Sequence, residues 1–140
     1  MLENCVFCRI IAGELPCDKV YEDDLLLGFL DIAPLNPGHV LLIPKEHHPS
    51  ATTLPAPVAA RMFQVAPKLA QALVRATDAG GFNLLLANGT AAGQVVLHVH
   101  LHIVPRHADD GLVLPTRSVA YASAEAKAHL LAKVRARLDA

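Results

Sequence analysis

Three histidines, His98, His100 and His102, alternate with aliphatic residues in the last third of the chain. In a β-strand, side chains at positions i, i+2 and i+4 lie on one face, about 7 Å apart. The alternation therefore predicts a strand that carries imidazoles on one face and Val, Leu and Ile side chains on the other. We expect the aliphatic face to pack in the core and the imidazole face to carry the chemistry.

An imidazole titrates near neutral pH, so each of these histidines can serve as a metal ligand, a nucleophile or a proton donor. A single histidine on such a strand is usually a satisfied polar side chain. Three buried histidines in alternation would each need a hydrogen-bond partner, which is hard to explain as accident. The pattern thus indicates either a metal site or a catalytic site.

A second pattern of chemical interest lies near the N-terminus, where two residues separate Cys5 from Cys8. Two cysteines at this spacing can hold one tetrahedral zinc ion, although a redox pair or two ordinary buried cysteines would give the same pattern. A zinc ion would need two further ligands. The candidates are His47 or His48, together with His98.

The segment before the histidines, residues 88–94, contains small residues that let backbone N–H groups approach an anion. An ordinary hairpin turn would look the same. A phosphate held by this loop would lie over the start of the histidine face, within reach of His100 and His102. Asp31, at the end of a predicted strand, is either a turn former or a ligand for a ribose diol.

The composition predicts a single folded domain over residues 1–140, because 53% of the residues are hydrophobic and only 18% are charged. The apolar runs are shorter than the ~20 residues that span a bilayer. The first residues lack the pattern of a signal peptide, so we expect a cytoplasmic protein without a membrane partner, whose three cysteines are thiols or metal ligands. A net charge of −1 with scattered Lys and Arg does not predict nucleic-acid binding. The apolar excess in so short a chain favours association with a second copy.

Hydrophobic periodicity and turn residues divide the chain into short elements. We expect helices at residues 5–12 and 56–77 and in the tail after Ser123, and strands at 20–22, 25–31, 38–44, 82–86 and 95–104. The first three strands are close enough in sequence to form an antiparallel meander. The predicted fold class is α+β, with one five-stranded antiparallel sheet and two main helices packed against it.

Together these patterns resemble the histidine triad (HIT) family, whose signature is His-x-His-x-His-x-x with x apolar, matched by residues 98–104. The similarity covers most of the chain and is closest to the small Hint-like bacterial branch. The other matching segments, in chain order, are residues 5–16, 20–23, 29–32, 38–40, 43–47 and 92–106.

The resemblance implies a homodimer whose two sheets join into one, and hydrolysis or transfer at the α-phosphate of a purine nucleotide. In this family the residue that matches His100 attacks phosphorus and forms a nucleotidyl-histidine. Its opposite ring nitrogen can donate to a backbone carbonyl, which fixes the tautomer. The residue that matches His102 contacts the phosphate and helps the leaving group depart.

The nucleotide-binding residues follow from the same resemblance. Asp31 matches the acid that binds the ribose, and Ile32 lies beside it. The residues that match the purine pocket, each also a reasonable core residue, are Phe7, Ile10 and Phe29, with Val6 and Leu15 nearby. The residues assigned to the phosphate are Asn88, Gly93, Gln94 and Val95.

Some members of the family bind zinc through the cysteine pair and two histidines, which map to Cys5, Cys8, His47 and His98. Such a zinc ion would be structural, because four protein ligands leave no open position.

Two residues depart from the Hint-like pattern. Val95 stands where many of these proteins have a hydroxyl residue, and Ala87 stands where they commonly have Asn. A hydrogen bond to a charged group contributes about 1.5 to 3 kcal/mol, so these changes would lower activity.

The function implied is that of a nucleoside phosphoramidase, acting on purine nucleoside phosphoramidates or related AMP conjugates. One alternative is a dinucleoside polyphosphate hydrolase, and another is a nucleotide-binding regulatory protein with little turnover. A third is a metal-binding module that uses all three histidines of the triad.

Overall fold

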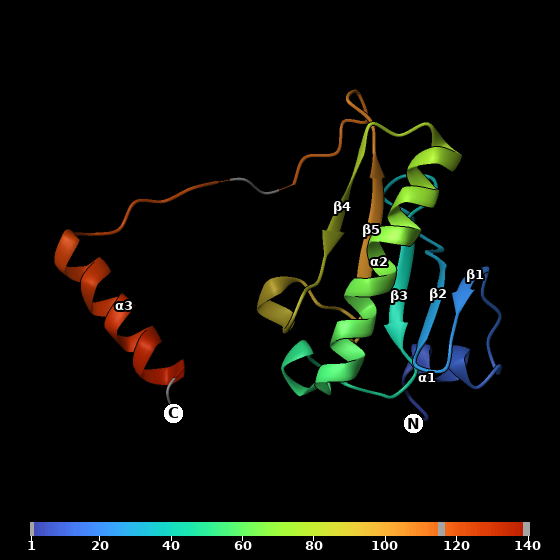
Figure 1. Ribbon diagram of the computed structural model, residues 1–140, viewed down its shortest axis with the longest axis horizontal. Helices are drawn as coiled ribbons and strands as arrows, with labels where there is room; N and C mark the ends of the chain where they lie inside the picture. The colour runs from blue at the N-terminus through green and yellow to red at the C-terminus, as the bar shows by residue number, and fades with distance from the viewer. Residues whose placement is uncertain (1, 115–116, 139–140) are drawn as a thin grey trace.

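A five-stranded antiparallel sheet with strand order β1-β2-β3-β5-β4 forms the centre of the protein (Figure 1). The computed structural model describes residues 2–114 and 117–138. The strands are β1 (Lys19–Glu22), β2 (Leu26–Leu30), β3 (Val40–Pro44), β4 (Gly81–Leu85) and β5 (Leu101–Arg106). The helices are α1 (Val6–Ile11), α2 (Ala56–Thr77) and α3 (Ala124–Leu138), with 3-10 turns η1 (Ala51–Thr53) and η2 (Thr90–Ala92). The α+β class and the five-stranded antiparallel sheet expected from the sequence are confirmed.

The two faces of the sheet pack against different helices, because successive side chains along a strand point to opposite faces. On one face, Leu42 and Leu101 pack with Met62 of α2. On the other face, Leu41 packs with Phe7 of α1. Figure 1 shows α2 lying along the sheet, and α1 beside the lower ends of the strands. The site described below lies on the face opposite α2.

Most predicted elements are confirmed to within two residues at each end. They are the first helix, the helix over 56–77, the first three strands and the fourth strand. The antiparallel meander is also confirmed, since β1 pairs with β2 and β2 with β3 in antiparallel register. The helix α2 begins and ends at the residues that the periodicity of 56–77 predicts.

The strand that carries the histidines differs from the prediction. The alternation predicts a strand over 95–104, whereas β5 begins at Leu101, so His98 and His100 lie in an irregular segment before it. The Val99 N–H donates to the His48 carbonyl (2.7 Å), which takes it out of the sheet's hydrogen-bond ladder. β5 also continues through Pro105, where β3 no longer pairs with it and the missing N–H needs no partner on that side.

The turn before β3 approaches the end of α2 closely at Gly38. Its φ of +90° is a left-handed conformation that favours glycine. A Cβ atom at this position would lie 2.9 Å from the Thr77 Cγ2 atom and 3.3 Å from the Pro105 Cγ atom. Glycine therefore allows this turn, α2 and β5 to meet.

The helix α3 lies apart from the sheet (Figure 1). Its predicted N-cap is confirmed, since the Ala126 N–H donates to Ser123 Oγ at 3.0 Å. None of the described residues of α3 is buried, and its four apolar residues Leu130, Leu131, Val134 and Leu138 are each at least 48% exposed. The expected packing of this helix against the sheet is therefore wrong, because residues 117–123, which precede it, are exposed like the helix itself.

Within residues 2–114 and 117–138, no helix combines the length and the apolar character that a bilayer crossing requires.

Candidate active site and metal centre

Four side chains converge where the start of α1 meets the segment before β5. Cys5 and Cys8 come from the N-cap and first turn of α1, His47 follows β3, and His98 precedes β5. Their ligand atoms all lie within 4.8 Å of one another. The Sγ atom of Cys5 is 3.5 Å from His98 Nδ1, and that of Cys8 is 3.4 Å from His47 Nδ1. The two Nδ1 atoms are 3.2 Å apart.

This cluster has the geometry of a tetrahedral metal site. Ordinary zinc bond lengths place two nitrogen ligands about 3.3 Å apart, and a nitrogen and a sulfur about 3.6 Å apart. The His98 Nε2–H donates to the Pro44 carbonyl (2.8 Å), which leaves the Nδ1 lone pair for a metal. Burial lowers the pKa of His98 to about 4, so the ring is neutral at pH 7, as a ligand must be. His48, the alternative to His47, is not part of this cluster.

His100 is held in one tautomer by the backbone. Its Nδ1 atom lies 2.7 Å from the His98 carbonyl oxygen. A carbonyl only accepts, so Nδ1 carries a proton, and the neutral form of His100 keeps its lone pair on Nε2. The imidazole is almost fully buried, and it packs edge-on against Phe7 with the ring centroids 5.2 Å apart. His100 is thus oriented to act as a nucleophile at Nε2.

His102 is held in the opposite tautomer by a chain of hydrogen bonds. The Leu35 N–H donates to Nδ1 of His39 (3.1 Å), so a neutral His39 carries its proton on Nε2. That nitrogen lies 2.9 Å from His102 Nδ1, which accepts the bond. Neutral His102 therefore keeps its own proton on Nε2. The ring centroids of His100 and His102 are 4.9 Å apart. In their neutral forms, the lone pair on His100 Nε2 and the proton on His102 Nε2 therefore belong to neighbouring rings.

Burial also determines the charge of the His102 and His39 rings. Burial, together with the proximity of His100 and His39, lowers the pKa of His102 to about 4 against the attraction of Asp31. Burial lowers the pKa of His39 as well, against the attraction of Asp31. Both rings are consequently neutral at pH 7, which is the state that the tautomer assignment requires.

His39 is a site residue that the sequence analysis missed. It lies outside the alternating triad, and it is 2% exposed at the start of β3. The feature that would have indicated His39 is the pairing of β3 with β5, which places the residue before Val40 next to the histidine segment. A five-stranded order could not be derived from the sequence, so this contact was not predicted.

A pocket of about 490 Å³ opens beside His100 and His102. It is lined by the five residues assigned to the base and ribose, namely Phe7, Ile10, Phe29, Asp31 and Ile32. Most of the lining is apolar, and the ring centroids of Phe7 and Phe29 are 5.8 Å apart. The carboxylate of Asp31 lies 3.7 Å from His39 Nε2. A flat apolar base and a polar diol would both find suitable contacts in this pocket.

The loop assigned to the phosphate is a preformed turn outside that pocket. Gly89 and Gly93 adopt left-handed φ angles of +87° and +86°. Gln94 holds the loop together: it accepts from the Gly89 N–H (2.7 Å) and donates to the Pro49 carbonyl (2.8 Å). The Gln94 side chain is only 3% exposed, so it acts on the shape of the loop.

The two ends of this loop differ in exposure and partners. The Asn88 side chain accepts from the Ala51 N–H (2.7 Å) and so ties the loop to η1. Val95 is 90% exposed. The residues assigned to the phosphate are absent from the described lining of the base and ribose pocket.

The three triad histidines do not converge on one ion. His98 faces the cysteines, His100 donates to a backbone carbonyl, and His102 accepts from His39. This geometry disfavours the metal-binding module that uses all three.

Comparison with known proteins agrees with the geometry. A family model described as the HIT domain matches residues 12–109. The adenylylsulfatase HINT3 of Arabidopsis thaliana is 51% identical over 109 residues, which are 78% of this chain and 55% of that protein. The chain thus spans just over half the length of that relative. The adenosine 5'-monophosphoramidase hnt1 of Schizosaccharomyces pombe is 41% identical over 103 residues, 74% of either chain.

A crystal structure of a Zn-bound histidine triad family protein from Mycobacterium smegmatis aligns with 97% of this chain and 96% of its own. The TM-score is 0.74 and the sequence identity is 39%. The chain therefore belongs to the HIT family, as the sequence analysis predicted, and it has relatives that are named as hydrolases of adenylyl compounds.

The burial of His102 predicts a loss of stability in acid. Its folded pKa of about 4 lies below the ordinary imidazole value of about 6.5, so between these values the unfolded chain binds a proton that the folded chain does not. The stabilisation is complete above that ordinary value and is lost as the pH falls towards the folded pKa. We expect the Tm to fall between pH 7 and pH 5, and to fall less in His102→Gln. Circular dichroism during heating measures this.

His129→Gln is the matched control, because His129 is exposed on α3. The Tm of this variant should fall with decreasing pH as steeply as that of the wild type. An equal fall of Tm with pH in the wild type, His102→Gln and His129→Gln would contradict the prediction.

Proposed function

We propose that the protein is a nucleotide hydrolase that cleaves purine nucleoside phosphoramidates, or related AMP conjugates, at the α-phosphate through a nucleotidyl-histidine on His100. The observation that carries this proposal is the complementary pair of tautomers beside one pocket. His100 has an unprotonated Nε2, and neutral His102 has a protonated one. The relatives named as an adenylylsulfatase and an adenosine 5'-monophosphoramidase support it.

In the proposed reaction the purine binds between apolar side chains such as Phe7 and Phe29, and the ribose diol binds the Asp31 carboxylate. His100 Nε2 attacks phosphorus. The bond from phosphorus to the leaving nitrogen breaks as that nitrogen takes the proton of His102 Nε2, and the negative charge left on His102 is balanced by the positive charge on the substituted His100 ring beside it. Water then attacks phosphorus, breaks its bond to His100, returns a proton to His102 and releases AMP.

The phosphate oxygens also need donors while charge develops. The N–H groups of Gly93 and Gln94 bond back to Thr90 and Gly89 within the loop. The N–H of Val95 finds no acceptor among the residues that the structure describes, and we assign it to the phosphate. In this proposal Asn88 and Gln94 act indirectly, by holding the loop in place.

The test compares wild-type protein with His100→Asn on adenosine 5'-phosphoramidate and, separately, on a diadenosine polyphosphate. Release of AMP is followed by chromatography. We expect the wild type to release AMP and the variant to lose roughly 10³-fold or more in rate, because asparagine offers no nucleophilic nitrogen. His129→Asn should keep the wild-type rate.

The same experiment separates the alternatives. Faster release from the polyphosphate would favour a dinucleoside polyphosphate hydrolase. Binding of AMP without release from either compound would favour a regulatory nucleotide-binding protein, as the loss of polar groups at Ala87 and Val95 suggests.

We also propose that the metal centre holds a structural zinc ion on Cys5, Cys8, His47 and His98. The Zn-bound relative and the ligand distances support this choice. Four protein ligands leave no position for substrate, so the ion would tie α1 to the end of β3 and to the segment that carries His100.

Removal of the thiols should therefore affect stability more than chemistry. We expect Cys5→Ala/Cys8→Ala to contain no zinc by atomic emission and to melt more than about 5 °C below the wild type. Cys17→Ala and His100→Asn should each retain one zinc ion per chain. A double variant with an unchanged Tm, together with a zinc-free wild type, would overturn the proposal.

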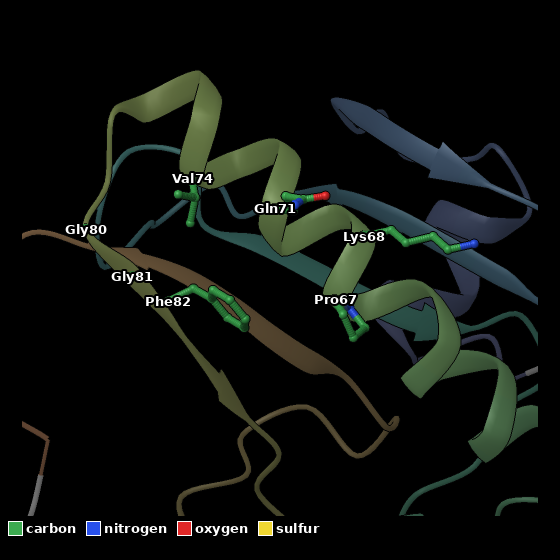
Figure 2. A pocket seen from close by; sticks show the side chains of 7 residues that line it. All are labelled: Pro67, Lys68, Gln71, Val74, Gly80, Gly81 and Phe82. Carbon is green, nitrogen blue, oxygen red and sulfur yellow. The ribbon is translucent and has the colours of Figure 1, made fainter.

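We propose that the protein acts as a homodimer that joins two sheets at β4. This strand lies at one edge of the sheet, so its outer N–H and C=O groups are open to a second strand. Figure 2 shows the adjoining groove between α2 and β4, with Phe82 reaching from β4 towards Pro67 of α2. Phe82 is 42% exposed, so this edge carries an uncovered aromatic ring.

A charge at this edge should separate the two copies. We expect light scattering to give the mass of a dimer for the wild type and of a monomer for Phe82→Asp, because a buried carboxylate without a partner is costly. Val20→Asp, on the opposite edge strand β1, should remain dimeric. A monomeric wild type at micromolar concentration would refute the dimer.

We treat residues 1–140 as one HIT domain, since the family match covers 12–109 and the site draws on residues from Cys5 to His102. Purine nucleotides are the proposed ligands, with no nucleic acid or membrane partner. We place the protein in the cytoplasm, where a reducing environment keeps thiols such as Cys5 and Cys8 available for zinc.

A further inference from the structure

The loop between β2 and β3, residues 31–39, is anchored by the side chain of Asn36. Its Nδ2 atom donates to the Pro105 carbonyl and to Asp110 Oδ2, each at 2.9 Å. β3 pairs with β5 only as far as Ile103, so Asn36 supplies a partner for a carbonyl just beyond the end of that ladder. The second bond, to Asp110, goes further and ties the loop to the turn that follows β5.

Asp110 is a rigid anchor for this bond. Its side chain is 6% exposed, and it accepts from Arg106 Nε (2.7 Å) and Nη2 (3.0 Å). The N–H groups of His107 and Leu112 also donate to it. The Arg106 guanidinium, more than the backbone donors, holds the pKa of the Asp110 carboxyl well below its usual range. Asp110 is therefore charged at neutral pH and is held in place by groups other than Asn36.

The backbone beside this anchor binds His39. The Leu35 N–H donates to His39 Nδ1 (3.1 Å), and the Asn36 carbonyl accepts from the His39 N–H (3.0 Å). Leu35 is 47% exposed, so water could bind its N–H if the loop moved. The bond from Leu35 to His39 therefore depends on an anchor in the loop, and the Asn36 side chain supplies it at the adjacent residue.

The Leu35 N–H decides the direction of the hydrogen bond between His39 and His102. Nε2 of His39 and Nδ1 of His102 are 2.9 Å apart, and in two neutral rings either nitrogen could be the donor. With Leu35 bound to its Nδ1, neutral His39 must donate, so the proton of His102 stays on Nε2. The Asp31 carboxylate lies 3.7 Å from His39 Nε2, too far for a hydrogen bond that would fix this direction.

We propose that Asn36 is a positioning residue of the active site, which holds the Leu35 N–H on His39 and thereby keeps the proton of His102 on Nε2. The use of that proton rests on the proposed function, whereas the positioning is a property of the free protein. The turn over residues 107–112 thus controls the acid of the site, although it is absent from the described lining of the nucleoside pocket.

The tautomers can be measured by ¹⁵N NMR of histidine-labelled protein at pH 8, because a protonated ring nitrogen and one with a lone pair differ in chemical shift. In the wild type we expect a protonated Nε2 on both His39 and His102. Asn36→Ala should show a second population, in which His102 carries its proton on Nδ1. The opposite tautomer of His102 in the wild type would overturn the proposal without any variant.

Kinetics of the full-length protein on adenosine 5'-phosphoramidate measure the consequence. Asn36→Ala should lower kcat by roughly tenfold, because an acid contributes about 10²–10⁴-fold and only part of the population loses it. KM should change by less than about twofold, because the nucleoside-binding end of the loop is held separately. There the Asp31 N–H donates to the His39 carbonyl, and Asp31 Oδ1 accepts from the Ala33 N–H, each at 2.9 Å. Asn36→Gln, which keeps both N–H donors, should recover part of kcat.

Asn83→Ala is the matched control. Asn83 Oδ1 accepts from Arg106 Nη1 (2.6 Å), so this variant removes one bond of the same network and leaves Asn36 intact. It should lower the Tm as Asn36→Ala does, and keep the tautomers and kcat of the wild type. An equal loss of kcat in both variants would show that Asn36 has only a structural role, and would overturn the proposal.

The outcomes separate this inference from the proposed function. Unchanged tautomers and an unchanged kcat in Asn36→Ala would overturn the inference and leave the hydrolase intact. A wild type that releases no AMP would refute the proposed function, and the NMR spectra would then still decide whether Asn36 fixes the tautomer of His102.

Discussion

The arrangement of both centres depends on the hydrogen bonds of His98. Its Nε2–H is bound by the Pro44 carbonyl, which turns Nδ1 towards the cysteines. Its own carbonyl accepts the proton of His100 Nδ1. One fully buried residue therefore orients a candidate metal ligand through its side chain and a candidate nucleophile through its backbone. A shift of this residue would disturb both centres.

The complementary tautomers of His100 and His102 require a protected and well-ordered environment. A lone pair on His100 and a proton on His102 are useful together only if neither ring rotates and neither takes up a proton from water. The backbone supplies the fixed points of both: the carbonyl of His98 for one ring, and the Leu35 N–H, through His39, for the other. Substitution of a side chain cannot remove the His98 carbonyl or the Leu35 N–H, but it can remove the His39 ring that links Leu35 to His102.

The sequence allowed much of the fold to be predicted, and the reasons differ between elements. The helix over 56–77 has a long amphipathic period, and its limits were correct to the residue. The histidine strand was placed too early, because alternation records which side chains are buried and not whether the backbone pairs in a ladder. His98 and Val99 are indeed buried, but the Val99 N–H bonds to a loop. The free position of α3 could not be foreseen, since its apolar stripe looks the same whether or not it is covered.

Some residues of the candidate site could be predicted from the sequence and others could not. Spacing alone indicated the cysteine pair, and four ligands came together as the family resemblance implied. Asp31 and Phe7 have no distinctive pattern of their own, and only the resemblance placed them in a nucleotide pocket. The roles of His39 and Gln94 depend on hydrogen bonds between segments that are distant in the sequence, which no local pattern indicates.

The isolated position of α3 has a consequence for how this part of the chain is maintained. A single helix of 15 residues is only marginally stable in water, and most of its stability must come from packing of its apolar face. The described residues of α3 obtain no such packing from their own chain. Its helicity should therefore depend on protein concentration, because any surface that covers Leu130 and Val134 must come from another molecule. On dilution, the amides of this helix would exchange with solvent long before those of the sheet.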